Sequence, residues 1–196
     1  MKNLMLFELE ENYYNFLVKY DSKIMYNKNA PIGSRPYVGI VLDINNYKYF
    51  APLTSPKPKQ NKQKIRHSID MILIDNGKYG AINLNNMIPA KLCFLKIKKY
   101  DILANDTLKE KQYKLLLANQ IQWCNILNNK NLIKTNANQI YKIKNNNRVK
   151  NKNILKLKER CCDFKILEKQ CDIAFNVLME KATNYKNIIP KMNTKN

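Results

Sequence analysis

The first half of the chain consists of short apolar runs separated by turn residues, a pattern typical of strands. Two pairs between such runs, Asn45-Asn46 and Asn76-Gly77, predict tight turns, and the second is a strong type I′ hairpin signal. The runs expected to form strands cover residues 3–9, 37–44, 47–53, 68–75, 78–84 and 90–97. This half therefore predicts a mostly antiparallel sheet of five to six strands.

Helical spacing dominates the second half. A capping box formed by Thr107 and Glu110 begins a helix that should reach about residue 129. Residues 131–146 can form another helix, although their asparagines weaken it, and residues 147–160 fit a loop, a strand or a helix. A last helix is expected over 163–185, with one face made by Phe164, Leu167, Cys171, Ala174, Phe175 and Leu178. An earlier helix is expected over 10–21, from the spacing of Tyr13, Phe16, Leu17 and Tyr20.

These elements predict one α+β domain, a twisted antiparallel sheet surrounded by about four helices. A chain of 196 residues fits a single domain, which we place at residues 1–186, with a sheet-rich part at 1–98 and a helical part at 106–186. Residues 187–196 are expected to form a flexible tail. No apolar run approaches the ~20 residues that cross a membrane, and the acidic start does not resemble a secretory signal, so we expect a cytoplasmic protein that does not contact membranes.

The chain carries a formal net charge of +20, and its bases cluster. No acid lies between Asp43 and Asp70, where there are six bases, or between Glu110 and Glu159, where there are eleven. Two basic faces favour a polyanion as partner, above all nucleic acid, although a merely solvated basic surface is the alternative.

Several kinds of chemistry find no support in the sequence. The five cysteines show no C-x-x-C spacing and the chain has one histidine, so we expect reduced thiols and neither a metal site nor a cofactor. The four glycines match no phosphate-binding loop. The acids are few and scattered, and His67 is a weak candidate for a general base.

The stretch "FAPLTSPKPK", residues 50–59, places two hydroxyls and two ammonium groups directly after a buried run. Thr54 and Ser55 can donate to phosphate oxygens, and Lys57 can neutralise charge that develops on phosphorus. The prolines limit the freedom of the segment, which lowers the entropy lost on binding. RNA carries its own nucleophile, the 2′-OH, so such a site could cleave RNA without a metal. A simple proline-rich turn is the alternative on chemistry alone.

Two longer motifs give a resemblance to a family. "YVGIVLDINNYKYFAPLTSPK" and the later "GAINLNNMIPA" resemble the ToxN/AbiQ family, the endoribonuclease toxins of type III toxin–antitoxin systems. The resemblance implies a fold related to small mRNA-interferase toxins, and cleavage of RNA that leaves 2′,3′-cyclic phosphate and 5′-OH ends. It also implies that a small repeat RNA antitoxin is processed by the toxin and silences it in a closed assembly, that phage infection releases the toxin, and that its substrates are cellular or phage RNAs rich in adenine.

The family's functional residues fall on particular positions of this chain. Its key serine matches Ser55, with Thr54 beside it and Lys57 after it, and its first-helix tyrosine matches Tyr13, with Tyr14 as the register alternative. A basic residue, lysine in some members, matches Arg35, which grips phosphate but does not shuttle protons near neutral pH. Tyr26 and Tyr37 are loose matches to a loop tyrosine.

Two sets of bases are expected to contact RNA, the second of them in an antitoxin groove between residues 142 and 158. They are Lys59, Lys62, Lys64 and Arg66, and then Lys142, Lys144, Arg148 and Lys150. Two other functions remain open, a non-catalytic RNA-binding module and an mRNA interferase neutralised by a protein antitoxin.

Overall fold

A computed structural model describes residues 3–26, 34–56 and 68–192, with side chains up to residue 183. Its centre is an antiparallel sheet, which within the described residues has seven strands. The strands are β1 (Met5–Leu9), β2 (Tyr37–Ile44), β3 (Tyr47–Thr54), β4 (Met71–Leu73), β5 (Ala81–Asn83), β6 (Ile88–Pro89) and β7 (Leu95–Ile97). Their order is β4-β5-β3-β2-β1-β7, and β6 pairs with β3 beside this path.

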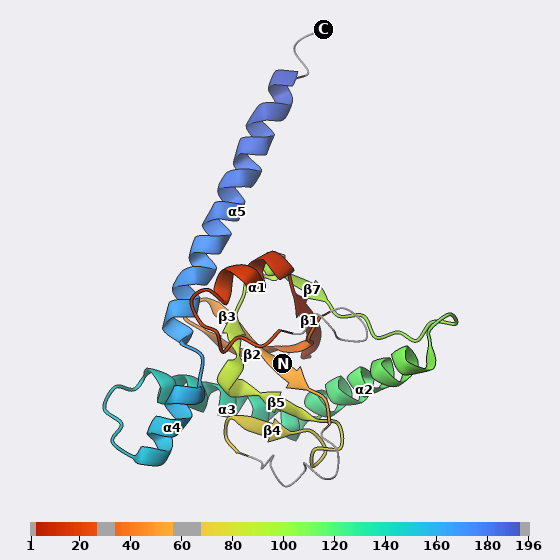
Figure 1. Cartoon of the computed structure of the whole chain (residues 1–196), viewed down its shortest axis with the longest axis vertical. Helices are drawn as coiled ribbons and strands as arrows, with labels where there is room; N and C mark the ends of the chain where they lie inside the picture. The colour runs from red at the N-terminus through yellow and green to blue at the C-terminus, as the bar shows by residue number, and fades with distance from the viewer. Residues whose placement is uncertain (1–2, 27–33, 57–67, 193–196) are drawn as a thin grey trace.

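Five α-helices accompany the sheet in the described part of the chain (Figure 1). They are α1 (Glu11–Leu17), α2 (Leu108–Asn125), α3 (Leu127–Asn145), α4 (Lys152–Arg160) and α5 (Phe164–Met192). Helix α3 packs against β2 and α2, whereas α1 packs against α5. The far part of α5 projects away from the body of the molecule (Figure 1), and every side chain from Asn176 to Thr183 is exposed.

The α+β prediction is confirmed, with one more strand than expected, the two-residue strand β6. Residues 90–97 form a 3₁₀ turn (Leu92–Phe94) before β7 rather than one strand. The capping box is confirmed, since Thr107 and Glu110 bond each other's backbone. The open segment 147–160 contains helix α4, which the side chain of Asn151 caps. Helix α5 runs past the predicted end to Met192, and the segment between residue 185 and Pro190 has no proline or glycine that would stop it earlier.

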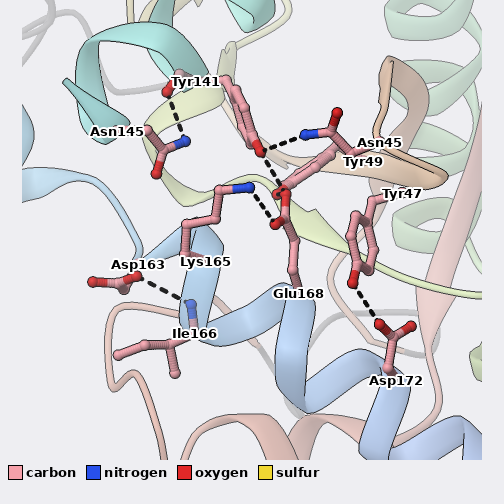
Figure 2. A network of polar contacts seen from close by, with 10 residues as sticks. All are labelled: Asn45, Tyr47, Tyr49, Tyr141, Asn145, Asp163, Lys165, Ile166, Glu168 and Asp172. Carbon is pink, nitrogen blue, oxygen red and sulfur yellow. Dashed lines mark hydrogen bonds and ion pairs between the residues drawn. The ribbon is translucent and has the colours of Figure 1, made fainter.

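A buried carboxylate ties the sheet to the last helices. Glu168 of α5 accepts hydrogen bonds from the hydroxyls of Tyr49 on β3, at 2.8 Å, and Tyr141 on α3, at 2.7 Å. It also forms an ion pair with Lys165, at 2.8 Å. Figure 2 shows this network, together with the bond from Tyr47 to Asp172 one turn further along α5. The network fixes β3 through groups far away in the sequence.

Burial of thiols and phenols predicts lower stability in alkaline solution. Burial raises the pKa of Cys124 to about 12 and that of Tyr113 to about 12, and it raises the pKa of Tyr49 further. Unfolded thiols ionise near pH 9 and unfolded phenols near pH 10, while the folded groups keep their protons. The contribution of these groups to the free energy of unfolding is therefore complete at neutral pH. Above pH 9 the free energy of unfolding falls by about 1.4 kcal/mol per pH unit for each group that is ionised only in the unfolded chain.

Urea unfolding under reducing conditions at pH 7.5, 9 and 10.5 measures this effect. Replacement of Tyr113 by phenylalanine should make the decline above pH 10 less steep by one group's share. A free energy of unfolding that stays constant to pH 10.5 would contradict the prediction.

No helix in the described ranges is long and apolar enough to cross a membrane.

Candidate active site at the end of strand β3

Strand β3 carries the predicted hydroxyls out of the core. Leu53 pairs with Ile82 and Thr54 pairs with Ala81, and the strand ends there. Leu53 is buried, Thr54 is half-buried with its hydroxyl 3.4 Å from the Ala81 carbonyl, and Ser55 is exposed. Ser55 is thus exposed to solvent directly after the last residue of an inner strand. An exposed position suits a side chain that has to contact a large substrate.

Arg35 lies beside this strand end. Its Nη1 donates to the carbonyl of Leu53 at 2.9 Å, and the Leu53 amide donates to the carbonyl of Pro36 at 2.9 Å. Two adjacent bonds therefore hold the segment that contains Arg35 against the residue preceding Thr54. The Arg35 charge also lies close enough to Tyr113 of α2 to oppose the rise in the pKa of that phenol, which burial causes and Glu8 increases.

A buried ion pair supports the Arg35 segment. Lys98 follows β7 and pairs with Glu8 of β1, and its ammonium group also lies 3.4 Å from the carbonyl of Ser34. The same ammonium group lies 5.6 Å from the centre of the Tyr113 ring. The Lys98 charge is balanced by Glu8, so Arg35 supplies the positive charge at this end of the sheet, where it would stabilise a phosphate.

Helix α2 and the turn before β5 contact the same strand end. Gln120 of α2 donates from Nε2 to the carbonyls of Tyr79, at 2.7 Å, and Thr54, at 3.3 Å. Gly80 lies against Thr54 so closely that an added Cβ would be 1.9 Å from the Thr54 carbonyl oxygen. Its φ of +93° also favours glycine. The end of β3 is therefore restrained from several sides.

Tyr13 is not brought together with Thr54 and Ser55. Its ring is buried and stacks on Phe94 with 4.2 Å between centroids, and its hydroxyl donates to the carbonyl of Pro89 at 2.8 Å. Pro89 pairs with Tyr49, five residues before Thr54, which is roughly 16 Å along a strand. Burial raises the pKa of Tyr13 well above the usual value. These contacts favour a packing role for Tyr13.

The other candidate tyrosines are also engaged in contacts. Tyr14 stacks on Tyr26 with 4.2 Å between ring centroids. Tyr37 is fully buried and its hydroxyl donates to the carbonyl of Met25.

The predicted bases fall into two groups. Lys57, Lys59, Lys62, Lys64, Arg66 and the candidate base His67 lie outside the described residues. Lys142 and Lys144 lie in the last turn of α3, and Arg148 and Lys150 lie between α3 and α4. Lys142, Arg148 and Lys150 are exposed, whereas Lys144 is half-buried and donates to the carbonyl of Lys158 at 3.3 Å.

Sequence reasoning missed Tyr113, Gln120 and Lys98, which come from outside the strand motif. One signal was available for the first two. Tyr113 and Gln120 are seven residues apart on a helix with a clear start, so they share the face of the buried Leu117. A glutamine at a core-facing position indicates a buried hydrogen bond. Within the described ranges, no group of three or more His, Cys, Asp or Glu side chains could hold a metal ion.

Comparisons with known proteins show the family and the fold. A family model described as Toxin ToxN, type III toxin-antitoxin system, matches residues 5–172. An endoribonuclease ToxN of Bacillus thuringiensis subsp. kurstaki is 32% identical over 166 residues, which cover 83% of this chain and 80% of that protein. A solved structure from work on selective toxin inhibition by a non-coding RNA pseudoknot has a TM-score of 0.72 at 29% identity, covering 88% of this chain and 98% of the other.

AbiQ, a lactococcal anti-phage endoribonuclease of a type III system, shares the fold, with a TM-score of 0.68 at 24% identity over 89% of this chain and 99% of its own. The family match, the related proteins and the fold together define the class, an endoribonuclease toxin. The chain belongs to the ToxN family of type III toxin–antitoxin toxins.

Proposed function

We propose that this toxin cleaves RNA by attack of a ribose 2′-OH on the adjacent phosphodiester, which leaves 2′,3′-cyclic phosphate and 5′-OH ends. The observation that carries the proposal is the exposure of Ser55 at the end of β3. Thr54 lies next to it in the chain, and Arg35 donates a hydrogen bond to the carbonyl of Leu53. The attacking oxygen is part of the substrate, so the protein has to align the phosphate and stabilise its charge.

The residues take different parts in this reaction. The Ser55 hydroxyl donates to a non-bridging phosphate oxygen, and Thr54 restrains the strand end through Ala81. Arg35 and Lys57 contribute positive charge, and Arg35 keeps that charge throughout because a guanidinium does not lose its proton in a protein. The proposal excludes Arg35 from proton transfer.

We further propose that a small repeat RNA is the antitoxin. The toxin cuts this RNA into units and remains bound to them in a closed assembly. When phage infection releases the toxin, it acts on adenine-rich cellular or phage RNA. Two observations support this partner. One related toxin is inhibited by a non-coding RNA pseudoknot, and another is an anti-phage endoribonuclease. The exposed bases Lys142, Arg148 and Lys150 supply a second basic surface beyond the strand-end site.

The test is cleavage in EDTA of a transcript that spans the DNA repeats upstream of the gene, followed by mapping of the product ends. We expect cuts at one position per repeat, with cyclic phosphate on the 5′ fragment and a 5′-OH on the 3′ fragment. Binding without cutting would favour the non-catalytic RNA-binding module. A small acidic reading frame in place of the repeats would favour a protein antitoxin.

A further inference from the structure

Gln120 connects three segments that are far apart in the sequence. It comes from α2, its side chain is 2% exposed, and its amide nitrogen donates to the Thr54 carbonyl at the end of β3 and to the Tyr79 carbonyl before β5. Its amide oxygen is buried and has no hydrogen-bond partner within the described ranges. An unsatisfied buried acceptor lowers stability, so the position is not optimised for packing alone.

The bond to Thr54 constrains Ser55 directly. The Thr54 carbonyl and the Ser55 amide belong to one planar peptide group, so holding the oxygen orients the plane from which the Ser55 Cα projects. Within the sheet this peptide group is held on one side only, through the pair of Thr54 with Ala81, which is the last pair between β3 and β5. Beyond Thr54 the strand hydrogen bonds end.

Gly80 constrains the same oxygen from the side of the turn. A side chain at this position would overlap the Thr54 carbonyl oxygen, at 1.9 Å, and would also lie 3.0 Å from the carbonyl carbon of Ser55. The turn therefore packs directly against the peptide groups on both sides of Ser55. Gln120 and Gly80 form a clamp, defined here as these two residues acting on the Thr54–Ser55 peptide group.

We infer that Gln120 is a positioning residue for RNA cleavage, which acts through the Thr54–Ser55 peptide group to aim the Ser55 hydroxyl. The inference rests on the proposed function of Ser55. Small errors of placement are costly in such a site, since a displacement of about 1 Å lowers rates by about 10²-fold. The clamp contacts the protein backbone and not the RNA, so the affinity for RNA should depend on other groups.

The test replaces Gln120 by leucine, which removes both donors at similar volume. We expect the single-turnover cleavage rate to fall about 30-fold. The affinity for an RNA with a 2′-deoxy residue at the cut should change less than about threefold, since the RNA contacts remain. Gln122→Leu, at an exposed position of the same helix, is the matched control and should leave the rate unchanged. A loss of affinity equal to the loss of rate would overturn the inference.

A double variant separates positioning from a general structural effect. If Gln120 acts through Ser55, then Gln120→Leu in a Ser55→Ala background should lower the residual rate less than about threefold. The same 30-fold loss in both backgrounds would show that Gln120 acts on the fold and would overturn the inference. Gly80→Ala displaces the same Thr54–Ser55 peptide group from the side of the turn. It should lower the cleavage rate in the wild-type background and much less in the Ser55→Ala background, which provides a second test if Gln120→Leu does not fold.

Hydrogen exchange distinguishes this inference from the proposed function. Gln120→Leu should speed exchange of the amides at the end of β3, while those of β1 and β7 keep their protection. Unchanged exchange at β3 would overturn the inference whatever the activity. If the wild-type protein does not cleave RNA, the proposed function is wrong. Faster exchange in Gln120→Leu would then show only that Gln120 restrains the end of β3.

Discussion

Replacement of Ser55 by alanine is expected to lower the single-turnover rate of RNA cleavage by about 10²–10³-fold, because a donor aimed at a developing oxyanion contributes about 3–4 kcal/mol to the transition state. The side chain is exposed and has no hydrogen bond to the residues that the structure describes, so its loss should leave stability unchanged. The affinity for an uncleavable RNA should fall only slightly. Rates measured at saturating protein separate the two effects.

Ser22→Ala is the matched control, since Ser22 is also an exposed serine but lies in the segment after α1. That variant should cleave at the wild-type rate. If Ser55→Ala retains a rate within about tenfold of wild type, Ser55 is not the donor, and the strand end is a binding surface rather than an active site.

Replacement of Glu168 by leucine should lower the free energy of unfolding by about 3 kcal/mol. The substitution leaves the hydroxyls of Tyr49 and Tyr141 without their acceptor in the core, at about 1–3 kcal/mol for each buried group. The partner Lys165 adds little, because its side chain is 54% exposed and water can solvate its charge. Urea unfolding at pH 7 measures the change.

Two further variants serve as controls for Glu168→Leu. Glu180→Leu removes an exposed carboxylate from the same helix and should change the free energy of unfolding by less than about 0.5 kcal/mol. Glu168→Gln keeps one acceptor oxygen, so its loss should be smaller than that of the leucine variant. A loss below about 1 kcal/mol for Glu168→Leu would mean that the two hydroxyls find other partners.

The features that the sequence predicted well are those with local causes. The capping box at Thr107 acts within one turn of helix, and the positive φ values of Asn76 and Gly77 fit the turn that these residues predict. The apolar runs 37–44 and 47–53, separated by the turn residues Asn45-Asn46, were enough to predict β2 and β3. Arg35 was a site candidate through the family resemblance; its bond to Leu53 places it beside the strand end, and its role stays a prediction.

The features that the sequence did not predict depend on contacts between distant segments. Tyr13 was a catalytic candidate by motif, yet the amphipathic spacing around it equally fits the buried ring that stacks on Phe94. Gln120 lies 66 residues from Thr54, and nothing in the local sequence connects them. Such pairings follow from how helices pack on the sheet, which hydrophobic periodicity does not specify.

The network at Glu168 has a consequence for the time at which the toxin matures on the ribosome. Strand β3 is synthesised early, but Tyr49 is secured by Glu168 of the last helix. Strand β1 likewise gains its second neighbour only with β7, which is made after β2 and β3. Because a chain emerges from its N-terminus onward, the strand that bears Ser55 lacks its full support until translation has almost finished. A chain that terminates before Glu168 therefore lacks the group that secures β3, and we expect a complete strand end only near the end of synthesis.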